Sequence, residues 1–241
     1  MSLAHGRRRI DRDSILRGQR DSSMQEAMVC IFVKPPEPGA VKTRLIPELG
    51  PERTAELAEA FLQDTVAMVR ALPWAECIIA ATKTFARDYF KPEEVWLQSE
   101  GDLGERLEKV LRLALKRREI VLAIGGDSPG LPAAYMERAR QALKTADAVL
   151  GPSADGGFYL MGLKDCPVGV LDGIQWSHST TLAATTHKLE QFGMKTVLID
   201  PWFDIDSHED LERLRRQLAN DPTPAPHTAE WLRRAFPSPS K

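Results

Sequence analysis

Apolar and polar positions follow two different periods along the chain, and the two periods alternate. Short continuous apolar runs such as "MVCIFV" are typical of strands that are buried on both faces of a parallel sheet. Strands are expected at 28–33, 76–82, 94–98, 119–126, 147–152, 157–163 and 195–200. Between these runs, apolar residues recur every three or four positions, which indicates amphipathic helices. Helices are expected at 51–72, 103–118, 132–146, 179–193 and 207–219.

This alternation of strands and helices predicts an α/β fold, a three-layer α/β/α sandwich around a mostly parallel sheet. Ligands bind to such sheets at the carboxyl ends of the strands. The functional residues are therefore expected in the loops that follow strands or approach the same edge of the sheet. These loops are 34–44, 99–106, 126–131, 152–157 and 200–207.

The two ends of the chain differ from its centre. Residues 1–27 are dense in charge, with no apolar period and no apolar segment typical of a secretory signal, so we expect a variable, disordered extension. Residues 28–220 are expected to form a single domain. Residues 221–241 are rich in proline and are expected to form a tail with one short helix in "AEWLRRAF".

Composition narrows the functional classes. The net charge of −2 gives no broad basic field for nucleic acid, and no apolar run approaches the roughly 18 residues of a membrane span. The three cysteines are far apart and odd in number, so we expect buried free thiols rather than a disulfide framework or a zinc site. A soluble protein of the reducing cytoplasm is the expectation.

The loop after the first strand, "KPPEPGAVKTRL", concentrates cationic side chains around one glycine. Gly39 would let backbone N–H groups approach an anion, and Lys42, Thr43 and Arg44 would bind phosphate. The spacing is neither a Walker A loop nor a GxGxxG loop. A solvated basic loop explains the same residues, and this alternative stays open.

Acidic residues follow two other strands. In "AIGGDSPGLP", Asp127 comes directly after a buried strand and Gly126, a placement that suits a divalent cation which also touches phosphate. In "WFDIDSHEDL", Asp204 and Asp206 alternate onto one face if the segment is extended, so that a second carboxylate would reach the same cation. The alternative is that Asp127 caps the helix that starts near Pro132, and that Ser207 or Asp206 caps the last helix.

Three further groups are weaker candidates. In "GPSADGGFYLMGL", Asp155, Gly156 and Gly157 form either an ordinary hairpin turn or a contact with substrate. Asp102 and Arg106, in "EGDLGERL", suit either a nucleotide contact or a plain helix start. His178 in "QWSHST" is typical of polar lining near a helix N-terminus.

Five of these motifs together resemble those of the DUF2064 family. They are "KPPEPGAVKTRL", "GGDSPGLP", "GPSADGGFYLMGL", "GIQWSHST" and "DIDSHEDL", and they occur here in the family's order between about residues 28 and 214. The resemblance implies the GT-A fold of the nucleotide-diphospho-sugar transferase superfamily. It also implies that Lys42 and Arg44 hold the nucleotide phosphates and that Asp127 and Asp206 hold Mg²⁺ or Mn²⁺.

Three functions are compatible with these residues. The first is transfer of a glycosyl group from a nucleotide-activated sugar to a small-molecule acceptor, with Lys42 and Asp155 as catalytic residues and Asp155, Gly156, Gly157 and His178 near the acceptor or sugar. The second is nucleotidyl transfer from a nucleoside triphosphate with release of pyrophosphate. The third is a non-catalytic nucleotide-binding protein whose acidic residues only cap helices.

Overall fold

The computed structural model describes residues 25–91 and 94–237, so the N-terminal extension expected at 1–27 lies almost entirely outside the described residues. Strands form a single sheet in the order β3-β2-β1-β4-β6-β5-β7. Their bounds are β1 Ala27–Val33, β2 Ala75–Ala81, β3 Val95–Leu97, β4 Ile120–Gly125, β5 Ala148–Pro152, β6 Phe158–Leu163 and β7 Thr196–Leu198. All strand pairs are parallel except the two that β6 makes with β4 and β5. The predicted mostly parallel sheet is confirmed.

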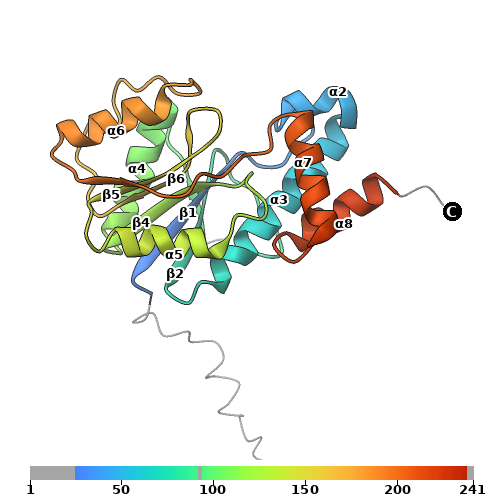
Figure 1. The fold of residues 1–241 in the computed structure, drawn as a ribbon, viewed down its shortest axis with the longest axis horizontal. Coiled ribbons are helices and arrows are strands. Elements are labelled where there is room, and N and C mark those ends of the chain that lie inside the picture. The colour runs from blue at the N-terminus through green and yellow to red at the C-terminus, as the bar shows by residue number, and fades with distance from the viewer. Residues whose placement is uncertain (1–24, 92–93, 238–241) are drawn as a thin grey trace, which may run out of the picture.

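Helices cover both faces of this sheet (Figure 1). Helices α3 (Pro51–Ala71) and α5 (Ala133–Ala142) pack on the face that buries Val29 and Ile31 of β1. Helices α4 (Leu103–Leu115) and α6 (Thr181–Gln191) pack on the face that buries Met28 and Cys30. Successive β1 residues thus enter opposite apolar layers, as the continuous apolar run predicts. No helix in the described part of the chain is long and apolar enough to cross a membrane.

The centre of the sheet places three loops at one edge. Strand β1 is parallel to both β2 and β4, and Phe32, near its end, is in register with Ala80 and with Gly125. The chain leaves β1 towards β2 on one side and later returns to β4 on the other. The carboxyl ends of β1 and β4 therefore form a topological switch point, where open α/β sheets bind their ligands.

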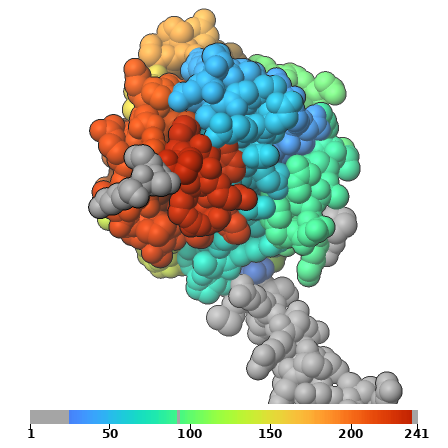
Figure 2. All heavy atoms as spheres, turned by 90° about the vertical axis from the view of Figure 1, so that its right-hand side faces the viewer, coloured from blue at the N-terminus to red at the C-terminus, as the bar shows by residue number. Residues whose placement is uncertain are grey.

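A third apolar cluster lies beside the sandwich and includes the end of the chain. It joins α3 to α2 (Ile46–Leu49), α7 (His208–Asn220) and α8 (Pro226–Ala235) through buried residues such as Phe61, Leu214 and Trp231. Figure 2 shows α7 and α8 side by side on the surface formed by α2 and α3. The short helix expected near the C-terminus is present, and it packs as part of the globular unit.

A buried carboxylate fixes the start of α8. Asp64 of α3, whose exposed fraction is 3%, accepts the backbone N–H groups of His227 at 2.9 Å and Thr228 at 2.8 Å. It also accepts the Thr228 hydroxyl at 2.6 Å. The first N–H groups of a helix lack partners within the helix, so a carboxylate from another helix satisfies them here and complements the helix dipole.

Two expectations about local structure are resolved by the fold. All three cysteines are buried and free, as predicted. The segment after the first loop was not expected to be helical, yet Thr43–Leu45 forms a 3₁₀ turn, η1, that runs into α2. Both are short, and their helical form comes from packing of Leu45 and Leu49 in the third apolar cluster rather than from an amphipathic period.

Candidate active site

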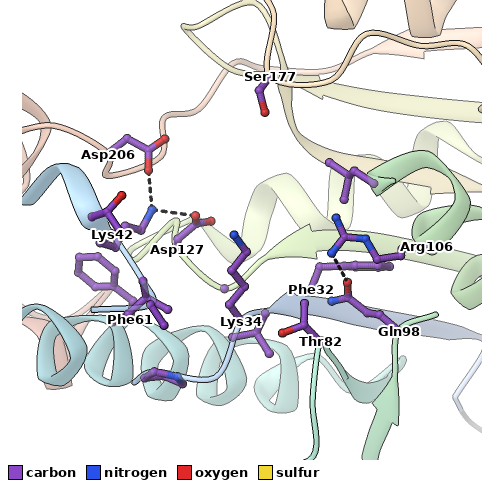
Figure 3. A pocket seen from close by; sticks show the side chains of 18 of the residues that line it. Phe32, Lys34, Lys42, Phe61, Thr82, Gln98, Arg106, Asp127, Ser177 and Asp206 are labelled. Atoms are coloured by element: carbon purple, nitrogen blue, oxygen red, sulfur yellow. Dashed lines mark hydrogen bonds and ion pairs between the residues drawn. The ribbon is translucent and has the colours of Figure 1, made fainter. Parts of the chain in front are cut away.

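A cleft of about 680 Å³ opens at the carboxyl ends of β1, β2 and β4. This volume lies within the usual range of small-molecule sites, about 300–1,000 Å³. Its walls come from the loop after β1, the loop after β4, the start of α4 and the segments around residues 176 and 206. Figure 3 shows Lys42, Asp127 and Asp206 at one end of the cleft and Thr82, Gln98 and Arg106 at the other.

The first loop owes its shape to a turn. Ala40 donates its N–H to the Glu37 carbonyl at 3.1 Å, with Pro38 and Gly39 between them and a φ of 77° at Gly39. Proline followed by a residue of positive φ is the arrangement of a type II turn. Gly39 lies outside the cleft lining, whereas Lys42, Thr43 and Arg44 are within it. The turn explains why a glycine is needed at position 39. The predicted contact between Gly39 and phosphate stays a prediction.

Lys42 joins the two acidic residues predicted to hold a metal. Its Nζ lies 2.8 Å from Oδ2 of Asp127 and 2.8 Å from Oδ1 of Asp206 (Figure 3). The Lys42 side chain is only 8% exposed, while those of the two aspartates are 41% and 51% exposed. Residues from three distant segments thus meet at one point of the switch-point edge.

Electrostatics make this contact a strong one. Burial alone would lower the pKa of Lys42, but the negative charges of Asp127 and Asp206 outweigh burial and raise it. Burial opposes ionisation of Asp206, and Lys42 outweighs it in turn, so the pKa of Asp206 is lowered. Lys42 is therefore an ammonium that bridges the two acids, rather than a solvated basic side chain.

The helix-capping alternative does not account for Asp127 or Asp206. Helix α5 follows Pro132 and has no side-chain cap, and Asp127 instead contacts Lys42. Helix α7 is capped by Ser207 in a reciprocal pair with Asp210, which leaves the Asp206 side chain free to face the cleft. The capping role that we expected of Ser207 is confirmed.

Asp204 forms a second layer behind the two acids. It accepts the Ser128 hydroxyl, and its neighbour Ile205 donates its N–H to the Asp127 carbonyl at 3.3 Å. Burial and repulsion by Asp127 raise the pKa of Asp204 to about 7, although the Ser128 hydrogen bond and Lys42 oppose the rise. The predicted alternation of Asp204 and Asp206 therefore brings both near Asp127, with only Asp206 on Lys42.

The acidic pair fits a divalent cation. Carboxylate oxygens are the ligands that Mg²⁺ and Mn²⁺ favour, and Mg²⁺ needs only one or two of them beside phosphate and water. Asp127 and Asp206 already direct one oxygen each at the same cationic atom. Within the described residues, no group of three or more His, Cys, Asp or Glu side chains is arranged to hold a metal ion. The fit is thus to a two-carboxylate site.

The far end of the cleft holds uncharged and cationic hydrogen-bonding groups. Gln98 donates its side-chain amide to the Ala80 carbonyl at 2.6 Å, and its Oε1 lies 3.4 Å from Nη1 of Arg106. Asp102 caps α4 together with Glu105 and also lines the cleft, as do Arg106 and Gly126. Sequence reasoning named Asp102, Arg106 and Gly126 but missed Gln98, although Gln98 directly follows a strand at the same edge.

The residues assigned to the acceptor lie next to one another but outside the cleft lining. Asp155 accepts the Gly157 N–H at 3.0 Å, within the turn that joins β5 to β6. Gly156 packs against the backbone of Ser179, and His178 bonds to Thr180. The ordinary turn is therefore sufficient to explain Asp155. It is the neighbouring segment, Trp176 and Ser177, that reaches the cleft, and sequence reasoning missed both.

Comparison with known proteins supports the family assignment. The model of the DUF2064 family, described as an uncharacterized protein conserved in bacteria, matches residues 57–178. A crystal structure from Desulfovibrio desulfuricans G20 is 32% identical, covers 88% of this chain and 95% of its own, and superposes with a TM-score of 0.78. The chain belongs to the DUF2064 family. That relative is described, provisionally, as a nucleotide-diphospho-sugar transferase.

More distant structures share the fold of this DUF2064 member. The 2-C-methyl-D-erythritol 4-phosphate cytidylyltransferase of Thermus thermophilus is 15% identical, covers 81% of this chain and 100% of its own, and has a TM-score of 0.51. A CMP:2-keto-3-deoxy-manno-octonic acid synthetase complexed with CTP is 11% identical, covers 81% and 99%, and has a TM-score of 0.51. No curated protein matches the sequence. The predicted nucleotide-diphospho-sugar transferase fold is confirmed.

Proposed function

We propose that this protein is a transferase that binds a nucleotide-activated sugar in the switch-point cleft, together with Mg²⁺ or Mn²⁺, and transfers the glycosyl group to a small-molecule acceptor. The observation that carries the proposal is the convergence of Asp127, Asp206 and Lys42 on one point of this cleft. The family relative from Desulfovibrio desulfuricans supports the same class.

Each end of the cleft has a role in this function. Asp127 and Asp206 would hold the cation, which when bound would neutralise the charge of the leaving diphosphate. Lys42 and Arg44 would bind the phosphate oxygens, Lys as a point charge and Arg as a planar fork. Gln98, Thr82 and Arg106 offer hydrogen-bonding groups at the opposite end, where they would contact the rest of the nucleotide.

Nucleotidyl transfer is the second candidate, and a specific observation favours it. Lys34, Lys42 and Arg44 all line the cleft that contains the acidic pair. Three cations are well suited to a triphosphate and to the charge that develops on its α-phosphate oxygens. The same residues would then release pyrophosphate instead of a nucleoside diphosphate.

Thermal melting of the full chain with a panel of nucleotides distinguishes the candidates. A rise in Tm with a UDP-, GDP- or CDP-sugar that requires Mn²⁺ is the result expected of a glycosyltransferase. A rise with nucleoside triphosphates, followed by pyrophosphate release in the presence of small acceptors, would assign nucleotidyl transfer. Metal-independent binding without turnover would indicate the non-catalytic alternative, and the absence of any nucleotide-dependent shift would refute the proposal.

A matched pair of variants connects the panel to the site. Asp127→Asn removes one charged oxygen from the acidic pair, so the Mn²⁺-dependent part of the shift should disappear. Asp221→Asn removes a charge from an exposed residue at the end of α7, whose carboxylate accepts the Thr223 N–H, and should leave the shift unchanged. Equal shifts in Asp127→Asn and wild type would contradict the metal role of Asp127.

A further inference from the structure

The bridge between Lys42 and the two acids has a consequence for metal binding. We propose that Lys42 acts as a built-in counter-cation, which occupies the cation position between Asp127 and Asp206 in the nucleotide-free protein and must leave it before a divalent metal can bind. This inference rests on the proposed function, because it concerns the metal of that same site. It adds an order of events that the proposed function alone does not contain.

On the two oxygens that Lys42 contacts, the geometry makes the ammonium and a metal mutually exclusive. Lys42 Nζ lies 2.8 Å from Oδ2 of Asp127 and 2.8 Å from Oδ1 of Asp206. A magnesium ion contacts its oxygen ligands at about 2.0–2.1 Å, so an ion on these two oxygens would occupy the space of the ammonium group. The two positive charges would also repel each other at such close range.

The second carboxylate oxygen of Asp127, Oδ1, does not provide an alternative ligand for the metal. A Cβ placed on Gly125 would lie 2.4 Å from Oδ1 of Asp127, so this oxygen is turned against the Gly125 backbone. The other oxygen, Oδ2, is the one on Lys42. A metal that approaches from the cleft therefore meets the same oxygen that Lys42 holds.

Two features of Lys42 favour release of its side chain from the acidic pair. Its backbone has φ 45° and ψ 44°, a left-handed conformation that is uncommon and strained for a residue other than glycine. Its flexible stem projects into a cleft where Lys34 and Arg44 are also placed to bind anions. A polyphosphate in this cleft would offer the ammonium a new partner as the metal takes the carboxylates.

The exchange couples the two ligands. Metal alone must displace an ion-paired ammonium, whereas metal and nucleotide together provide a partner for every charge. Wild-type protein should therefore bind Mn²⁺ weakly without nucleotide and more tightly with it, and by linkage the nucleotide should bind more tightly with Mn²⁺. Removal of the Lys42 charge should abolish the cost of displacement and leave the acidic pair ready for metal.

The decisive experiment measures Mn²⁺ alone, by electron paramagnetic resonance of the free ion, with full-length protein and no nucleotide. Lys42→Met should bind Mn²⁺ about tenfold more tightly than wild type. Lys144→Met loses the same charge from an exposed turn that follows α5, outside the cleft lining, so its Mn²⁺ affinity should match wild type. Lys42→Arg retains the positive charge and should stay weak.

Thermal melting with and without Mn²⁺ serves as a second readout. If Lys42→Met does not fold without metal, Lys42→Gln provides the same comparison with a neutral hydrogen-bond donor. Equal or weaker Mn²⁺ binding by the neutral variants would overturn the exchange, even if wild type still binds Mn²⁺ with nucleotide. Conversely, tighter Mn²⁺ binding by Lys42→Met in a protein that ignores every nucleotide would support the exchange and refute the proposed function.

Discussion

Gly125 and Asp127 are fitted to each other so closely that the glycine determines where the carboxylate lies. A Cβ on Gly125 would approach Oδ1 of Asp127 to 2.4 Å, which is shorter than any ordinary contact. Gly125→Ala should therefore rotate Asp127 away from Lys42 and reduce Mn²⁺-dependent nucleotide binding by about tenfold or more, with a folded protein. Isothermal titration calorimetry with Mn²⁺ and the best nucleotide of the panel measures this.

The adjacent glycine provides the control. A Cβ on Gly126 would have no neighbour nearer than 3.6 Å, and those neighbours are apolar side chains such as Ile31 and Leu62. Gly126→Ala should therefore bind as wild type does, because the methyl group points into the core and the backbone is unchanged. If the two variants bind equally well, the position of Asp127 does not depend on Gly125.

Asp155 tests the sequence-based assignment of a catalytic residue against the turn seen in the structure. Its carboxylate accepts the Gly157 N–H, and Asn would keep an oxygen for this bond. Asp155→Asn should therefore leave nucleotide affinity within about twofold of wild type. Calorimetry measures both affinities. A nucleotide affinity that is tenfold or more weaker than that of wild type would indicate that Asp155 belongs to the binding site.

Asp64 should contribute strongly to stability although it is far from the cleft. Asp64→Ala removes three hydrogen bonds and leaves the first N–H groups of α8 buried without a partner. The free energy of unfolding should fall by about 2–4 kcal/mol, and less for Asp64→Asn, which keeps one acceptor. Urea denaturation followed by circular dichroism measures the change.

Asp221 is the matched control for this experiment. It is exposed, and its side chain also accepts a backbone N–H, that of Thr223, at 3.0 Å. Asp221→Ala should cost less than about 1 kcal/mol because water replaces the lost partner. A similar loss for both variants would mean that the cap on α8 is not what Asp64 contributes.

The cysteines should react only after unfolding. Burial raises the pKa of Cys77 and of Cys166 to about 12, and it raises that of Cys30 as well. Ellman's reagent attacks the thiolate, so native protein at mildly alkaline pH should stay unlabelled, whereas urea-unfolded protein should release three equivalents of chromophore. Rapid labelling of native protein would show that a thiol is accessible.

The same shifts give the stability a pH dependence. A thiol whose pKa is raised on folding keeps its proton to higher pH than in the unfolded chain. The associated stability is fully present below the pKa of an unfolded cysteine, about 8.5, and is lost as pH rises above it towards 12. Denaturation curves of wild type and Cys77→Ala across this range should converge as the pH increases.

Much of the fold could be predicted because its signals are local. The apolar run that became β1 alternates between two helix layers, and this placement buries every side chain of 28–31. The position of the site followed from one further step, since Lys42 and Asp127 come after neighbouring parallel strands. Gln98 satisfies the same rule after β3, so it could have been found by reading every strand end equally.

Other features depend on contacts that no local pattern announces. The bridge from Lys42 to both acids requires a left-handed backbone at a lysine, where sequence alone would favour glycine or asparagine. Helix α8 is anchored by a carboxylate 163 residues earlier in the chain. Asp155 belongs to a family motif, but its hydrogen bonds are made within its own turn. The sequence alone cannot distinguish such a turn from a contact in the cleft.

The order of the strands also limits pairing between the sheets of two molecules. Both outer strands, β3 and β7, have only 3 residues, and each exposes a leucine, Leu97 at 57% and Leu198 at 51%. Such short edges offer few unpaired backbone groups to a second chain, which limits intermolecular strand pairing. The long, strongly apolar strands that support the cleft are thereby kept in the interior, where they cannot seed aggregation while the protein remains folded.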